Sequence, residues 1–193
     1  MVMAEIKNKN QAYLDMDDKY VNPVLSRSAR IVAERASGSY IYDMNGDAYL
    51  DMGTGIAVNS VGHCHPKVVA AAKAQLDQLM HTSVTTHHQR YIELAKKLVE
   101  IAPSKKLDSV FLTNSGAEAV EGAIKMARYV TGRPVVINFR GSFHGRTIFT
   151  TALTTSKLYY REKYEPLPGS IFTVPFPYQF RSHFKDDADK CVE

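Results

Sequence analysis

A short polar turn at residues 114–118 contains the residue types of an anion-binding site. The turn reads NSGAE and stands between an apolar segment and a segment with helical spacing. Ser115 and Glu118 have the S-x-x-E spacing of a capping box, and Gly116 lacks a Cβ, so a ligand can approach the backbone closely. Because a helix N-terminus presents free N–H groups and the positive end of the helix dipole, the turn predicts a phosphate site. A serine cap without any ligand is the alternative, since such caps are common.

A second polar loop follows the next apolar segment and reads FRGSFHGRT over residues 139–147. Phe143 offers a flat face for a heteroaromatic ring, and His144 can pack or hydrogen-bond beside that ring. Arg146 can hold a carboxylate through two parallel hydrogen bonds. Taken singly, a core phenylalanine, a satisfied histidine and a solvated arginine are simpler interpretations. Together with the phosphate turn, the loop predicts a phosphorylated aromatic cofactor and an amino-acid or keto-acid substrate.

Alternating strand-like and helix-like segments position these two loops. Residues 109–113 and 134–139 are short apolar runs, and residues 117–130 between them have helical spacing. This order predicts an α/β fold from residue 109 onward, with a parallel sheet covered on both faces. Residues 171–174 form one more possible strand. Since ligands of open α/β sheets bind outside the carboxyl ends of the strands, both loops are expected to face one crevice.

The first part of the chain has a different pattern. Residues 39–51 contain two aromatic, β-prone runs around Asn45-Gly46, which is a strong signal for a β-hairpin. Residues 66–79 and 91–99 have the three- and four-residue apolar spacing of helices. This part is therefore expected to be a small β-containing segment that precedes the α/β part.

The composition excludes several classes of protein. The chain has 193 residues, 45% of them hydrophobic, and its 24 Lys and Arg against 20 Asp and Glu give a net charge of +4. It has no apolar run of the roughly 20 residues that a membrane helix needs, so no membrane partner is expected. The basic residues are spread along the chain, which argues against nucleic acid as a partner. With no signal-peptide core and only two cysteines, a cytoplasmic location is expected.

A cluster of histidines suggests a metal site at first sight. His63, Cys64 and His65 are consecutive, and three more histidines follow at positions 81, 87 and 88. Adjacent residues do not share one face at the ligand spacings usual for structural zinc. We therefore predict no metal site.

Ordered motifs along the chain resemble the class III, or ω-amino-acid, aminotransferases, which use pyridoxal 5'-phosphate (PLP). The resemblance runs from about residue 22 to residue 181. The matching motifs are YD at 42–43, GIAV at 55–58, GHCHP at 62–66, SGAEAVE at 115–121, KMAR at 125–128 and FHGRT at 143–147. Two later segments, 153–157 and 166–170, resemble the 4-aminobutyrate branch, although the acetylornithine and ornithine branches share the 143–147 motif.

The resemblance implies the N-terminal portion of a PLP-dependent transferase of fold type I, like aspartate aminotransferase. It further implies that residues 1–60 belong to the small domain and residues 61–193 to the first part of the large PLP-binding domain. The partial sheet is then parallel or mixed, with flanking helices.

The resemblance also implies how the cofactor binds. Ser115, Gly116 and Ala117 match the turn that binds the cofactor phosphate. Phe143 matches the aromatic residue that stacks on the pyridine ring, and His144 is its neighbour.

Two further positions are implied for the substrate. Arg146 matches an arginine that binds a substrate carboxylate in the 4-aminobutyrate branch, and Ile56 matches a residue that lines the substrate pocket. The implied reaction transfers an amino group from an ω-amino acid such as 4-aminobutyrate to 2-oxoglutarate.

The chain departs from the family in one respect. The family's Schiff-base lysine and the acid that pairs with the pyridinium nitrogen lie downstream of the motifs present here, and no lysine of this chain has a similar context. We therefore expect a truncated, inactive part with no catalytic residue of its own and weak or absent PLP binding. Its unfinished sheet predicts a homo-oligomer. The alternatives are a non-catalytic interaction module that reuses the fold and an acetylornithine- or ornithine-type fragment.

Overall fold

The computed structural model describes residues 9–24, 27–181, 187 and 189–190 and divides into two compact units. The first unit is Met1–His88 and the second unit is Gln89–Glu193. This division differs in position from the predicted boundary after residue 60, which concerns the domains of the family fold and stays a prediction.

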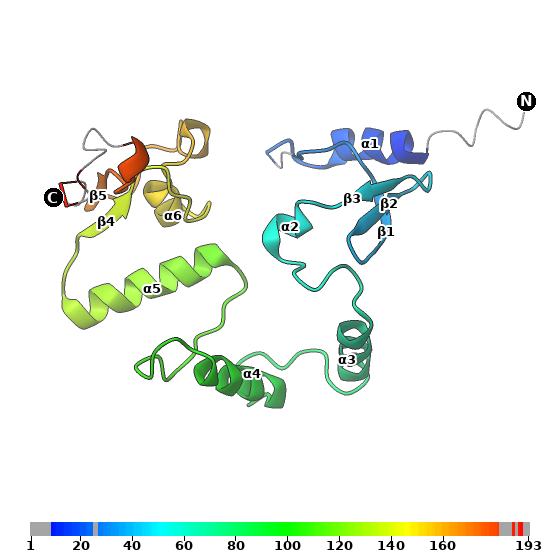
Figure 1. The fold of residues 1–193 in the computed structure, drawn as a ribbon, viewed down its shortest axis with the longest axis horizontal. Coiled ribbons are helices and arrows are strands. Elements are labelled where there is room, and N and C mark those ends of the chain that lie inside the picture. The colour runs from blue at the N-terminus through cyan, green and yellow to red at the C-terminus, as the bar shows by residue number, and fades with distance from the viewer. Residues whose placement is uncertain (1–8, 25–26, 182–186, 188, 191–193) are drawn as a thin grey trace, which may run out of the picture. The chain divides into compact units, whose positions relative to one another are not determined.

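The first unit is built on an antiparallel sheet of three strands. Its elements are α1 (Lys9–Tyr20), β1 (Ala33–Ser37), β2 (Tyr40–Asp43), β3 (Ala48–Leu50), α2 (Thr54–Ala57) and α3 (Pro66–Leu76). The order in the sheet is β1-β2-β3, and Gly46 in the β2–β3 turn has φ +91°, as the predicted hairpin requires. Figure 1 shows α1 beside this sheet. The hairpin and α3 are confirmed, whereas α1 and β1 lie in a region where no element was predicted.

The buried carboxylate of Asp43 joins α1 to the hairpin. Asp43 is 1% exposed. It accepts hydrogen bonds from Asn10 Nδ2 (2.6 Å), the N–H groups of residues 45 and 47 (both 2.9 Å) and Tyr49 Oη (3.2 Å). Burial raises the pKa of Asp43, but these hydrogen bonds outweigh it and hold the pKa below its ordinary value.

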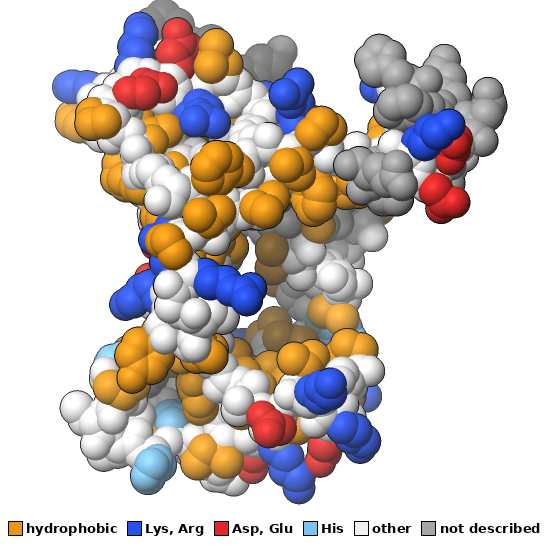
Figure 2. Space-filling view, turned by 90° about the vertical axis from the view of Figure 1, so that its left-hand side faces the viewer, with side chains coloured by type: hydrophobic (Ala, Val, Ile, Leu, Met, Phe, Trp, Pro, Cys, Tyr) orange, Lys and Arg blue, Asp and Glu red, His pale blue; other side chains and the backbone are white. Residues whose placement is uncertain are grey.

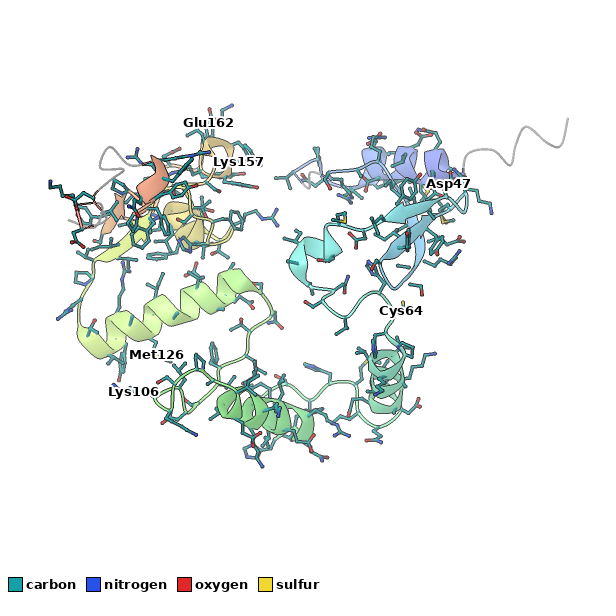
Figure 3. The ribbon with its side chains drawn as sticks, in the orientation of Figure 1. Asp47, Cys64, Lys106, Met126, Lys157 and Glu162 are labelled. Carbon is teal, nitrogen blue, oxygen red and sulfur yellow. The ribbon has the colours of Figure 1, made fainter. Side chains whose placement is uncertain are left out.

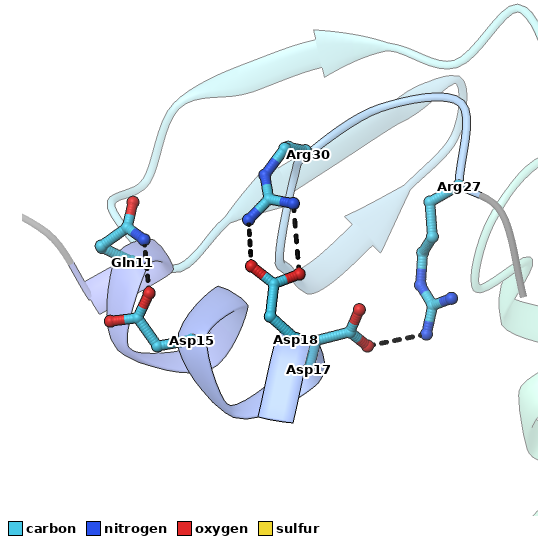
Figure 4. Close-up of polar contacts among 6 residues, drawn as sticks. All are labelled: Gln11, Asp15, Asp17, Asp18, Arg27 and Arg30. Carbon is cyan, nitrogen blue, oxygen red and sulfur yellow. Dashed lines mark hydrogen bonds and ion pairs between the residues drawn. The ribbon is translucent and has the colours of Figure 1, made fainter. Parts of the chain in front are cut away.

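Surface ion pairs tie α1 to the segment that follows it (Figure 4). Both terminal nitrogens of the Arg30 guanidinium contact the carboxylate of Asp18, Nη1 at 3.3 Å and Nη2 at 2.9 Å, and Arg27 contacts Asp17 at 2.8 Å. The Arg30 guanidinium lowers the pKa of the Asp18 carboxyl through this hydrogen bond. Because the side chains are exposed, these pairs contribute little to stability beyond orienting α1.

The second unit contains a parallel pair of strands packed against a short helix. Its elements are α4 (Gln89–Glu100), α5 (Gly116–Thr131), β4 (Val136–Phe139), α6 (Ile148–Leu153), η1 (Leu158–Tyr160), β5 (Ile171–Val174) and η2 (Gln179–Arg181). β4 and β5 pair in parallel, which confirms two predicted strands and the α/β class. The helices predicted at 91–99 and 117–130 are α4 and α5. Gly132, at φ +67°, ends α5.

The buried core of the second unit surrounds α6. Ala152 and Leu153 are its buried apolar residues, and Thr150 and Thr154 are fully buried beside them. Asn138 of β4 donates a hydrogen bond to the carbonyl of Leu153 and accepts one from Thr173 Oγ1 of β5 at 2.8 Å. This polar bridge connects the strand pair to the helix.

Two expectations for the sheet are wrong for the described part of the chain. Residues 109–113 form no strand there, and Leu112 N donates to Tyr91 Oη at 3.3 Å. The sheet is also not covered on both faces, because Ile137 and its register partner Phe172 are 65% and 59% exposed. An apolar run becomes a strand only where a neighbouring strand takes up its backbone hydrogen bonds.

Hydrophobic side chains therefore remain exposed on much of the surface, as the face shown in Figure 2 illustrates. None of the helices in the part of the chain that the structure describes is long and apolar enough to cross a membrane.

We expect Asp43→Ala to lower the thermal midpoint of the first unit by about 5 °C or more, because four donors lose the buried carboxylate that joins them. Circular dichroism during heating measures this. Asp47→Ala is the matched control, since it removes the same charge from an exposed position of the same hairpin. Equal midpoints for the two variants would contradict the role given to Asp43.

Candidate functional site

The predicted phosphate turn is the N-terminus of α5. Ser115 has extended backbone (φ −153°, ψ 160°), and its Oγ accepts a hydrogen bond from Glu118 N at 3.2 Å. This half of the predicted capping box is confirmed. In a capping box the Glu118 carboxylate accepts a hydrogen bond from Ser115 N. Here it accepts one from Asn114 N instead, at 2.6 Å. The two contacts fix the direction in which α5 begins.

The first amides of α5 are left free for a ligand. Within the part of the chain that the structure describes, no protein acceptor lies on the N–H groups of Ser115, Gly116 or Ala117. A Cβ built on Gly116 would meet nothing within 4 Å, so the space beside these donors is open. Free amides, open space and the helix dipole suit a phosphate group.

The loop of residues 140–147 packs directly against this turn. A Cβ at Gly145 would lie 2.7 Å from Ala117 Cβ and 2.7 Å from Thr150 Oγ1, and Gly145 has φ +135°. Only glycine therefore permits this approach of the loop to α5. Thr147 Oγ1 adds a hydrogen bond of 2.6 Å to Glu121 Oε1 of α5.

The buried hydroxyl of Thr154 holds the same loop from the other side. It accepts a hydrogen bond from His144 N at 3.1 Å and lies 3.1 Å from the carbonyl oxygen of Gly145. The half-buried His144 is thus fixed through its backbone. The structure brings the predicted phosphate turn and the loop of Phe143, His144 and Arg146 together, although the segment before the turn is not a strand.

Phe143 exposes half of its surface and packs against a tyrosine. Its ring and that of Tyr160 form an edge-to-face pair with centroids 5.1 Å apart and planes at 65°. Phe143 is 51% exposed, so a ring surface remains available for stacking. A hydrogen bond with Tyr159 and burial raise the pKa of Tyr160, while the nearby positive charge of Arg146 opposes this shift. Arg146 is itself exposed and available to an anionic group.

Ile56 belongs to the first unit and lies on a left-handed turn. Residues 54, 55, 56 and 57 have φ values of 45°, 65°, 64° and 62°. Such a conformation costs an L-residue about 1–2 kcal/mol at each position. Ile56 is 94% exposed, so the strained turn presents this side chain outward.

Asp51 anchors the beginning of that turn. Its Oδ1 accepts from Gly53 N at 3.0 Å and from Thr54 N at 2.8 Å, and its Oδ2 lies 2.6 Å from His63 Nε2. The hydrogen bond with His63, followed by that from Thr54 N, lowers the pKa of Asp51 against a smaller effect of burial. Through His63, the GHCHP motif thus holds the Asp51 carboxylate that caps the start of the turn.

Three supporting residues had no role in the sequence-based prediction. Gly145 lies inside the FHGRT motif, and its place between His144 and Arg146 was the sequence feature that could have pointed to a close backbone contact. Tyr160 and Thr154 act through contacts that depend on the folded chain. In the described ranges, no group of three or more His, Cys, Asp or Glu side chains is arranged to hold a metal ion.

Comparison with known proteins gives consistent matches. The family model described as aminotransferase class-III matches residues 22–193. Acetylornithine aminotransferase of Methanothermobacter thermautotrophicus is 40% identical over 86% of this chain and 42% of its own length. The probable 4-aminobutyrate aminotransferase of Bacillus subtilis is 38% identical over 85% of this chain and 38% of its own length. The chain thus spans about two fifths of the length of these curated relatives.

A solved structure agrees with these matches. Ornithine aminotransferase from Toxoplasma gondii, described with partial occupancy of PLP at its active site, superposes with a TM-score of 0.79. It is 25% identical, and the match covers 92% of this chain and 42% of that one. This likeness supports the fold-type-I assignment.

We expect Gly145→Ala to destabilise the second unit by about 1–3 kcal/mol, because the added methyl group forces the loop away from Ala117 and Thr150. Urea unfolding measures the change. Gly141→Ala is the matched control, since it has φ +84° but nothing within 4 Å of an added Cβ. A loss in Gly145→Ala no larger than in this control would show that the close contact is unimportant.

A pH dependence follows from Asp51. Because its pKa is lowered in the folded protein, Asp51 contributes stability above the ordinary aspartate pKa of about 4, and this contribution is lost as the pH falls through the lower folded-state value. The fall in thermal midpoint from pH 7 to pH 3 should therefore be smaller in Asp51→Asn than in Asp47→Asn. The same fall in both variants would show that the hydrogen bonds of the Asp51 carboxylate do not stabilise the fold.

Proposed function

The chain belongs to the class III aminotransferase family, and on this premise we propose that its protein transfers the amino group of an ω-amino acid to a keto acid, with PLP as cofactor. The observation that carries the proposal is the contact of Gly145 with Ala117. It brings the free amides of α5 beside the loop that presents an aromatic ring and a guanidinium.

The cofactor residues have distinct tasks in this proposal. The N–H groups of Ser115, Gly116 and Ala117 bind the phosphate, and the ring of Phe143 stacks on the pyridine ring with His144 beside it. The bound cofactor supplies an electron sink for the carbon that loses its proton. Tyr160 limits the tilt of Phe143 and so helps to orient the stacked ring.

The substrate is positioned by charge and shape. Arg146 binds the carboxylate of the ω-amino acid, which leaves the distant amino group free to reach the reacting centre. By the family resemblance, Ile56 also contributes to recognising the substrate. We propose 4-aminobutyrate as the amino donor and 2-oxoglutarate as the acceptor. Acetylornithine is the alternative donor, because relatives with both names match with similar identity.

We assign no residue of this chain to the proton transfer. None of its lysines stands in a motif like that of the family's catalytic lysine, so we propose that the 193-residue chain does not turn over substrate by itself and binds PLP weakly. We also propose a cytoplasmic homo-oligomer, supported by the exposed apolar pair Ile137 and Phe172. Residues 1–60 then belong to the small domain and residues 61–193 to the large one.

A PLP titration of the chain, followed by absorbance, tests the cofactor site. We expect saturable binding that weakens about tenfold in Phe143→Leu, because the stacking face is lost. Phe180→Leu is the matched control, since that phenylalanine is exposed and lies on η2, outside the proposed site. Equal affinities in the two variants would refute the stacking role.

Borohydride reduction and intact-mass analysis of the same samples test the assignment of lysines. We expect no single stoichiometric adduct, and no formation of glutamate from 2-oxoglutarate with 4-aminobutyrate or acetylornithine above background. A single modified lysine, or turnover with either donor, would overturn the proposal that the chain alone is inactive.

A further inference from the structure

A second candidate ligand site lies at the carboxyl end of the β4–β5 pair. A cavity of about 410 Å³ is lined there by Arg140, Thr155, Lys157, Leu158, Arg161 and Thr173. Arg140 directly follows β4, and Thr173 is the penultimate residue of β5. Ligands of open α/β sheets bind at this end of the strands. The position of the cavity is therefore consistent with a ligand site.

The charge of the cavity is unbalanced. Three cationic side chains, Arg140, Lys157 and Arg161, line it together with no acidic side chain. In the described ranges none of the three forms an ion pair with an acid. Glu162 is on the neighbouring turn (Figure 3) but does not line the cavity. Like charges gathered in one cavity repel each other, so a bound anion would be favoured.

The hydroxyl groups of the cavity are already engaged. Thr155 Oγ1 donates to the carbonyl oxygen of Phe139 at 3.1 Å, and Thr173 Oγ1 donates to Asn138 Oδ1 at 2.8 Å. These bonds fix the walls of the cavity, and the Lys157 ammonium lies 5.7 Å from the centroid of the Tyr159 ring, so the guanidinium groups of Arg140 and Arg161 are the main donors for a ligand. Guanidinium groups bind oxyanions through paired hydrogen bonds, so a ligand with several charged oxygens fits best.

We propose that this cavity binds a small oxyanion carrying at least two negative charges, either a phosphate group or a dicarboxylate. The site is distinct from the proposed cofactor site, because its donors are side chains and not the amides of α5. The segment around η1 separates the two: Tyr160 contacts Phe143, whereas Lys157 and Arg161 line the cavity. The proposal does not depend on PLP binding.

Calorimetric titration of the chain tests it, with inorganic phosphate and succinate as separate probes and sodium chloride keeping the ionic strength constant. We expect one saturable site for at least one probe, and affinity reduced about tenfold or more in Arg140→Met and in Arg161→Met. Arg133→Met is the matched control, because this arginine is exposed and does not line the cavity. Circular dichroism verifies that each variant is folded.

Gly116→Asp separates this site from the α5 turn, because it places a negative charge beside the free amides there. Binding that persists in Gly116→Asp and weakens in both arginine variants supports an oxyanion site in the cavity. The probe that binds shows whether the site prefers a phosphate group or a dicarboxylate. Binding lost in Gly116→Asp but kept in the arginine variants would place the anion at α5 and overturn the proposal. Failure of both probes to saturate any site would also overturn it.

Discussion

The candidate site depends on one steric constraint, the absence of a side chain at Gly145. A Cβ there would overlap Ala117 and Thr150, so glycine alone lets the loop after β4 lie against the start of α5. The free amides of α5 and the exposed ring of Phe143 belong to one site because of that contact. The hydrogen bonds of Thr147 and Thr154 keep the loop there, and through Thr154 they connect it to the buried core around α6. The same set of contacts therefore determines both the local packing and the geometry of the proposed binding site.

Much of the fold was predictable where a local signal decides the structure. The β2–β3 hairpin follows from the Asn45-Gly46 turn, and α5 runs from the Ser115 cap to the left-handed Gly132. The failures have a common cause in long-range contacts. α1 has little apolar periodicity and is oriented by Asp43, 33 residues beyond Asn10, and by ion pairs with the segment that follows the helix. Residues 109–113 have a strand-like composition, but composition supplies no neighbouring strand.

The same distinction holds for the candidate site. The residue types at 115–117 and 143–146 were sufficient to predict a phosphate turn and a stacking loop. The contacts that support them were not visible in the sequence, because Tyr160 reaches Phe143 and Thr154 reaches the His144 backbone only after α6 and η1 have folded. Residue type thus leads to the chemistry that we propose, whereas the packing around these residues is visible only in the structure.

The left-handed turn at residues 54–57 has a consequence for protein engineering. Any replacement of Ile56 changes two quantities together, the apolar side chain that we propose for substrate recognition and the energy of a backbone at φ 64°. Glycine or asparagine would relax the backbone while removing the apolar surface, whereas valine would keep the backbone strain and most of the apolar surface. A mutant library at this position would therefore mix selection for substrate with selection for expression. The two can be separated only by scoring each variant for folded yield before comparing its preference for substrates.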